Sequence, residues 1–165
     1  MKILVTGFMP FGGETVNPAY EAVRRLPAQI AGADIATVEI PVVYKKGPAA
    51  VEAAIDAEKP DMVLCVGQAG GRAEITPEFV GINYANFRIP DNEGFQPLSV
   101  KLEKDGPDAY FATLPVQAMV DACKEKGVPA NVSYSAGTYC CNEVLYELLY
   151  ALDPVSYTHL RAHET

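Results

Sequence analysis

The sequence predicts an α/β fold of three layers, in which helices cover both faces of a mixed, mostly parallel twisted sheet. Apolar runs short enough to be central strands alternate along the chain with segments of helical periodicity, and strands joined by helices run parallel. The 165 residues suffice to bury one core. Hydrophobic residues make up 49% and charged residues 21%, an ordinary globular composition.

The first half of the chain alternates strand and helix. The apolar run at 2–8 predicts a buried strand. Asn17 then caps a helix whose first residue is Pro18, and Pro27 ends that helix. The next predicted elements are a strand at 35–43, a helix at 49–58 and a central strand at 62–67.

The second half continues the pattern. A strand is predicted at 79–84, a long irregular loop follows, and a helix at 116–126 stops at Gly127. A last helix starts near residue 140, after a turn at Gly137, and carries apolar residues at helical spacing: Val144, Leu145, Leu148, Leu149 and Leu152. We predict one domain at 1–152, because the helical pattern stops after Asp153 and Pro154, followed at 153–165 by a tail that does not belong to it.

Composition excludes several classes of function. A formal charge of −8 would repel the phosphates of nucleic acids, and no basic run offsets it. No apolar window reaches the ~20 residues of a membrane span. The N-terminus has too short an apolar run for a signal peptide. Four cysteines without such a peptide predict free thiols and a cytoplasmic location.

The turn before the last helix carries two adjacent cysteines, Cys140 and Cys141. A helix start favours the thiolate over a thiol, whose usual pKa is about 8.5, and its N–H groups can also stabilise a developing oxyanion. The position therefore suits a nucleophile. The alternative is that both residues are small buried hydrophobes.

Three loops are predicted beyond the carboxyl ends of strands, where sites form in sheets of this kind. Phe8 and Phe11 follow the first strand and form either an apolar slot or a cap on the core. The glycine-rich loop at 67–78 suits phosphate, but lacks both the GK[ST] ending and the GxGxxG spacing. The polar turn at 88–94 is typical of a surface loop.

Taken together these motifs are specific. The set GFxPFGG…NP, GQAGGRxxITPE, INxxxxRIPDNEG and SAGTYxCN, in this order, closely resembles pyroglutamyl peptidase I, the family of pyrrolidone-carboxylate cysteine peptidases, over residues 1–152. The resemblance implies a phosphorylase/hydrolase-like α/β fold without cofactor or metal. It also implies hydrolysis of N-terminal pyroglutamyl residues from peptides by a Cys, a His and a Glu, in a homo-oligomer that is often a tetramer.

The resemblance also implies a role for individual residues. Cys141, which precedes the asparagine of GTYxCN, is the nucleophile, and Glu78 of ITPE is the triad carboxylate. The implied substrate-binding residues are Phe8 and Phe11 against the lactam ring, Gln68 and Ile89 lining the pocket, and Arg88 near the oxyanion.

One part of the pattern is missing. The family's histidine follows the cysteine by about two dozen residues on a later strand, whereas the two histidines here, His159 and His163, lie in SYTHLRAHET. The HLRAH spacing suits two zinc ligands, but HExxH and a third ligand are absent, which favours an incidental polar tail. We therefore expect this chain to be an inactive, truncated member of the family. Two alternatives stay open: a fragment that only binds pyroglutamyl ligands, and a phosphate- or nucleoside-binding α/β protein.

Overall fold

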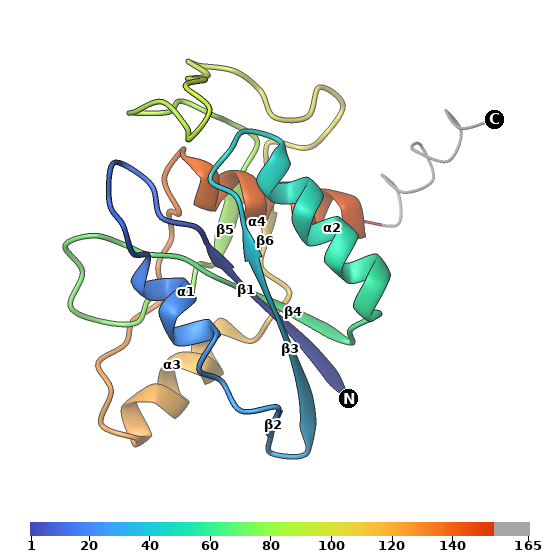
Figure 1. Ribbon diagram of the computed structural model, residues 1–165, viewed down its shortest axis with the longest axis vertical. Coiled ribbons are helices and arrows are strands. Elements are labelled where there is room, and N and C mark those ends of the chain that lie inside the picture. The colour runs from blue at the N-terminus through green and yellow to red at the C-terminus, as the bar shows by residue number, and fades with distance from the viewer. Residues whose placement is uncertain (154–165) are drawn as a thin grey trace. The chain divides into compact units, whose positions relative to one another are not determined.

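The computed structural model describes residues 1–153, and Figure 1 shows the order of their elements. These residues form two compact units. Unit 1 comprises 1–68 and 87–98, and unit 2 comprises 69–86 together with the described residues from 99 onwards. No helix within 1–153 is long and apolar enough to cross a lipid bilayer.

Unit 1 is built on a four-stranded sheet in the order β2-β3-β1-β4. Its strands are β1 (Lys2–Phe8), β2 (Gln29–Ile30), β3 (Ala33–Ile40) and β4 (Met62–Val66). β1 pairs in parallel with both β3 and β4, whereas β2 pairs with β3 in antiparallel fashion. The central strand β1 is buried from Leu4 to Phe8, as its continuous apolar run predicts.

Two helices cover this sheet. α1 (Pro18–Val23) connects β1 to β3, and α2 (Lys46–Glu58) leads from β3 across β1 to β4. The two connections run in opposite directions along the sheet, so right-handed crossovers place the helices on opposite faces. Figure 1 shows α1 and α2 on either side of the strands. Asn17 caps α1 as predicted, accepting a hydrogen bond from the Ala19 N–H at 3.0 Å.

Close approach of α1 to β1 depends on Gly7. A Cβ placed there would lie 2.8 Å from the Cα of Tyr20, a backbone atom of the helix. Only a residue without a side chain therefore fits at this crossing.

The structure moves several predicted boundaries. β3 ends at Ile40 rather than at residue 43, because Pro41 has no N–H to donate to a neighbouring strand. α2 begins at Lys46 rather than at 49, since Pro48 in the first turn needs no N–H. The short strand β2 was not predicted; it forms a hairpin with β3 through Ala31 and Gly32, both at positive φ.

Unit 2 contains the antiparallel pair β5 (Val80–Ile82) and β6 (Ala109–Phe111) with the helices α3 (Val116–Glu125) and α4 (Cys140–Leu152). The predicted strand at 79–84 is thus shorter, and β6 lies in what was predicted as irregular loop. α4 packs on β5, where a Cβ at Gly81 would lie 3.1 Å from the backbone nitrogen of Tyr146. Tyr146 is fully buried and donates to the carbonyl of Pro107 at 2.7 Å.

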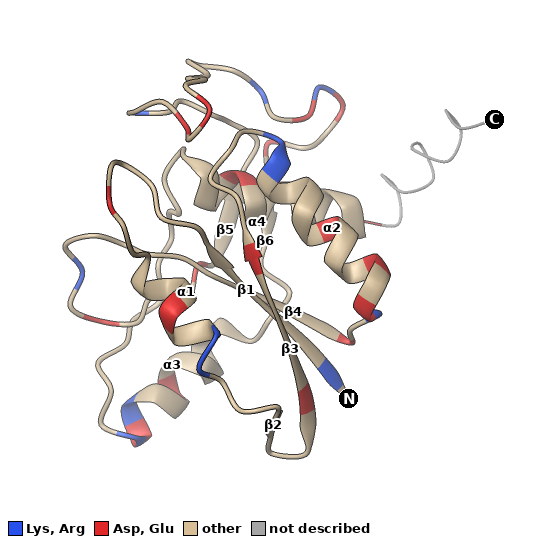
Figure 2. Ribbon diagram, viewed as in Figure 1, with Lys and Arg blue, Asp and Glu red and all other residues tan. Residues whose placement is uncertain are grey.

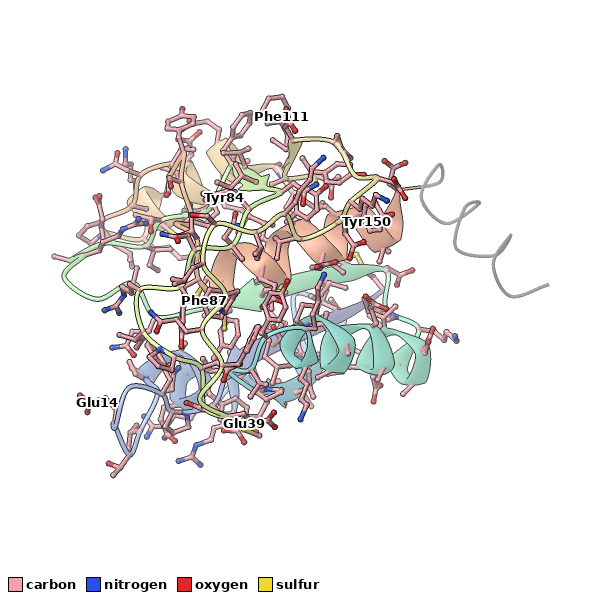
Figure 3. All side chains as sticks on the ribbon, turned by 90° about the horizontal axis from the view of Figure 1, so that it is seen from above. Glu14, Glu39, Tyr84, Phe87, Phe111 and Tyr150 are labelled. Carbon is pink, nitrogen blue, oxygen red and sulfur yellow. The ribbon has the colours of Figure 1, made fainter. Side chains whose placement is uncertain are left out.

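Aromatic residues cover the outside of this pair of strands. Phe79 packs against Phe111 with ring centroids 4.9 Å apart and against Tyr134 at 5.7 Å. The side chain of Phe111, labelled in Figure 3, is exposed.

A further pairing joins two segments outside the named strands of unit 2. The N–H of Ser133 donates to the carbonyl of Pro77 at 2.9 Å, and the N–H of Phe79 donates to the carbonyl of Ser133 at 2.8 Å. The same parallel pattern recurs between Ile75 and Ala130. Segments 75–79 and 129–133 are therefore held in fixed register.

The predicted fold class is confirmed: the chain has an α/β fold with a mixed, mostly parallel sheet and flanking helices. The division into one domain at 1–152 and a tail at 153–165 stays a prediction, and all of that tail except Asp153 lies outside the described residues. Figure 2 shows Lys and Arg scattered over separate elements, among the more numerous Asp and Glu.

The crossing at Gly7 yields a stability test. We expect Gly7→Ala to lower the free energy of unfolding by about 1–3 kcal/mol, because the methyl group must push α1 away from β1. Gly70→Ala is the matched control, since nothing lies within 4 Å of a Cβ at that position. Urea unfolding of both variants measures the difference. Equal stabilities would contradict the tight crossing.

Candidate active site

The first turn of α4 presents the two adjacent cysteines differently. Cys140 is buried, with 2% of its surface exposed, whereas Cys141 is half-buried. Gly137, at φ 73°, makes the turn that the sequence predicts ahead of the helix. The N–H of Glu143 donates to the carbonyl of Tyr139, one helical turn back, at 3.1 Å. Cys141 therefore lies at the positive end of the helix dipole, which favours a thiolate.

Asn142 fixes this turn to β5. Its Oδ1 accepts from the Ile82 N–H at 2.9 Å, and its Nδ2 donates to the carbonyls of Ile82 at 2.9 Å and Tyr84 at 3.1 Å. The side chain is 1% exposed. Three of its four hydrogen-bonding directions are thus used on backbone, and the residue after Cys141 is held in one position.

The glycine-rich loop at 67–78 ends on Glu78, which is half-buried and lies just before β5. The two oxygens of this carboxylate differ in their hydrogen-bond partners. Its Oε1 accepts from Nη1 of Arg72 at 3.2 Å, while its Oε2 is buried without a hydrogen-bond partner in the described part of the chain. A buried acceptor of this kind is uncommon in proteins, and a catalytic role is one of its explanations.

The arginine beside Glu78 contacts both sides of the pairing described above. Besides Glu78, Nη1 of Arg72 donates to Oγ1 of Thr76 at 2.7 Å and to Oγ of Ser133 at 3.3 Å. Its Nη2 donates to the carbonyl of Ser135 at 3.5 Å. The loop that carries Glu78 and the segment that leads to Cys141 are therefore linked through side chains as well as backbone. Arg72 is the only Lys or Arg between Gly67 and Glu78, and its donors are already used within the protein. This disfavours a phosphate site in the loop.

The polar turn at 88–94 is organised by a buried carboxylate in unit 1. Asp91 is 6% exposed and accepts three backbone N–H groups, those of Tyr44 at 2.8 Å and of Glu93 and Phe95 at 2.9 Å. Asn92 adds a link to the first loop, since its Nδ2 donates to the carbonyl of Pro10 at 2.9 Å. The turn is thus a built part of unit 1 rather than a loose surface loop.

These contacts gather the predicted substrate-binding residues at one edge of unit 1. Phe8 is buried at the end of β1, and Gln68 is exposed just beyond the end of the neighbouring strand β4. Ile89 reaches the first loop, where a Cβ at Gly12 would lie 3.8 Å from its Cδ1. Phe11 in that loop is half-buried and Arg88 is exposed.

The predicted residues thus fall into two groups. Phe8, Phe11, Gln68, Arg88 and Ile89 belong to unit 1, whereas Glu78 and Cys141 belong to unit 2. His159 and His163 lie outside the described residues. Within those residues, no three His, Cys, Asp or Glu side chains are grouped to hold a metal ion.

Three residues that organise these loops through hydrogen bonds were not identified from the sequence, namely Arg72, Asp91 and Asn142. A signal existed for Asp91, because an aspartate between proline and a glycine-ended turn commonly accepts from nearby backbone N–H groups. Arg72 and Asn142 stand inside the quoted motifs, but their partners are up to about sixty residues away in sequence. No local pattern identifies such partners.

Comparison with known families gives a match along most of the chain. The sequence model described as pyroglutamyl peptidase matches residues 1–163. The pyrrolidone-carboxylate peptidase of Enterococcus faecalis is 54% identical over 153 residues, which are 93% of this chain and 72% of that relative. Pyrrolidone-carboxylate peptidase 1 of Streptococcus pneumoniae is 56% identical over the same shares. This chain is therefore shorter than these relatives, as predicted.

Solved structures agree with this result. A crystal structure of Bacillus amyloliquefaciens pyroglutamyl peptidase I superposes with a TM-score of 0.90 at 47% identity, covering 94% of this chain and 76% of that one. A mutant pyrrolidone carboxyl peptidase of Pyrococcus furiosus gives a TM-score of 0.90 at 38% identity, with 96% and 77% covered.

The amide of Asn142 provides a test of the site's scaffold. We expect Asn142→Ala to lower the free energy of unfolding by about 2 kcal/mol, because it removes the Asn142 partner of the Ile82 N–H and of the Tyr84 carbonyl, whereas the Ile82 carbonyl keeps its bond from the Tyr84 N–H. Asn131→Ala is the control, since that exposed amide makes one side-chain hydrogen bond, to Glu74. Urea denaturation measures the free energy of unfolding of both variants. A loss no greater than that of the control would show that Asn142 does not anchor the turn.

Proposed function

The chain belongs to the pyroglutamyl peptidase family, and we propose that its complete form hydrolyses the amide bond after an N-terminal pyroglutamyl residue of peptides. The observation that carries the proposal is the state of Glu78. One of its oxygens is held by Arg72 and the other is buried without a partner among the described residues, on a segment paired with the one that leads to Cys141. That oxygen suits the N–H of a histidine in a Cys-His-Glu triad.

In the proposed mechanism Cys141 is the nucleophile. Its thiolate attacks the acyl carbon of the pyroglutamyl residue, and N–H groups in the first turn of α4 stabilise the oxyanion. The C–N bond then breaks as an imidazolium gives its proton to the departing amine. Water, deprotonated by the same imidazole, cleaves the thioester, which releases pyroglutamate and restores the thiol. Glu78 holds the imidazole in the required tautomer.

Pyroglutamate is uncharged at its lactam, so an apolar slot with a few hydrogen-bonding groups suits it. We assign that slot to the edge of unit 1: Phe8 and Phe11 against the ring, Gln68 and Ile89 lining it, and Arg88 near the oxyanion. Their gathering at the ends of β1 and β4 and on two linked loops supports this assignment. We also propose a cytoplasmic location and a homo-oligomeric, tetrameric complete form with pyroglutamyl peptides as its partners.

The 165-residue chain itself is proposed to be inactive. Its two histidines stand in SYTHLRAHET, away from the family's pattern. A general base must come within about 2.6–3.2 Å of the thiol, or one water away. We therefore define a completed chain for the tests below: residues 1–153 joined to the part of the Enterococcus faecalis relative that follows its counterpart of Asp153.

Turnover of pyroglutamyl p-nitroanilide tests the function. We expect the completed chain to release p-nitroaniline, Cys141→Ala to abolish release, and Cys140→Ala to retain most of it, because the buried neighbour does not meet substrate. The 165-residue chain should not exceed the Cys141→Ala background. Full activity in Cys141→Ala would sink the assignment. Activity of the 165-residue chain that vanished in His159→Ala or His163→Ala would show that the tail supplies the base.

Glu78→Gln in the completed chain tests the triad carboxylate. The amide keeps the shape but offers an N–H, or a weaker acceptor, where a carboxylate is needed. The comparable change in a serine triad costs about four orders of magnitude in kcat, and we expect a loss of that kind with little change in thermal stability. Glu74→Gln is the matched control, because Glu74 lies in the same loop and is exposed. A loss of kcat under about tenfold would make Glu78 a bystander.

A further inference from the structure

We propose that Arg72 is a positioning residue, which holds one oxygen of Glu78 so that the other faces the imidazole of the triad. The inference rests on the proposed function, since Arg72 acts only through Glu78. The arginine belongs to the glycine-rich loop, and nothing in the catalytic chemistry described above uses it.

The contact between Arg72 and Glu78 is one-sided. Nη1 of Arg72 lies 3.2 Å from Oε1 of Glu78, and no nitrogen of the guanidinium takes Oε2. An ordinary ion pair elsewhere in the chain looks different. At the C-terminal end of α1, Arg24 donates hydrogen bonds to both carboxylate oxygens of Glu21. Its Nε lies 2.9 Å from Oε1 and its Nη2 lies 2.6 Å from Oε2. Bidentate pairing is the arrangement that arginine and carboxylate commonly adopt.

The reason for the one-sided contact is that the guanidinium is shared. Nη1 also donates to Oγ1 of Thr76 and Oγ of Ser133, and Nη2 donates to the carbonyl of Ser135. These partners lie on both paired segments, so the planar group cannot turn to cover Oε2 of Glu78 without losing them. Oε2 stays buried and open to a further donor.

This arrangement gives Glu78 two fixed properties. Its backbone is held in register because Ser133 bonds to both of its neighbours, Pro77 and Phe79. Its side chain is held in one rotamer by the cation. A carboxylate that is held in this way pays little entropy when it accepts an imidazole N–H, which is how supporting residues raise rates without touching the substrate.

A double-mutant cycle in the completed chain tests the inference. Arg72→Gln should lower kcat about 10–100-fold, by analogy with residues that orient the ligands of a metal ion. KM should change little, because Arg72 does not touch the substrate. In a Glu78→Gln background the same substitution should cost less than about threefold, since its effect passes through a carboxylate that is no longer there. Arg72→Lys, which keeps the charge without the planar fork, should recover part of the rate.

Controls separate this role from simple destabilisation. Arg24→Gln removes the same charge from the exposed pair on α1 and should leave kcat unchanged. Thermal melts should show each variant folded at the assay temperature. A loss of kcat of equal size in both backgrounds would overturn the inference alone. An inactive completed chain, or one indifferent to Glu78→Gln, would overturn the proposed function and with it the inference.

Discussion

The parallel pairing of segments 75–79 and 129–133 is the constraint on which unit 2 depends. Ser133 exchanges backbone hydrogen bonds with Pro77 and Phe79, so the residue between them, Glu78, cannot slip relative to the chain that leads into α4. A slip of one residue would turn the carboxylate to the opposite face. Arg72 and Asn142 then fix the two ends of this arrangement, one at the carboxylate and the other at the helix start.

The two units supply different chemistry. Unit 1 offers aromatic and aliphatic side chains on loops held by a neutral amide, Asn92, and by the buried carboxylate of Asp91. Unit 2 offers a thiol at a helix start and an ionic network around Glu78. Burial raises the pKa of the Cys65 thiol in the sheet of unit 1. That thiol is therefore a poor nucleophile at neutral pH, whereas Cys141 lies where a helix dipole favours the charged form.

The features that the sequence predicted correctly are those that depend on residues close together along the chain. The apolar run of β1, the Asn17 cap with Pro18, and the turn at Gly137 all stand where predicted, because each depends on residues within a few positions. The strands that the sequence did not predict form because of pairing partners that are close in space. β2 forms only because an Ala-Gly turn lets it pair with β3, and β6 because β5 lies beside it. The family motif pointed to Glu78, but only the fold pairs it with Arg72 and Ser133.

The network around Asn142 carries a consequence for chemical ageing. Asparagine side chains lose ammonia slowly in water, and the amide is replaced by a carboxylate. At this position the product would set a carboxylate oxygen against the carbonyls of Ile82 and Tyr84, where the amide now donates two hydrogen bonds. Like partial charges would then meet in a buried site, immediately after Cys141. A modification of a single mass unit at Asn142 would therefore loosen the turn that carries Cys141.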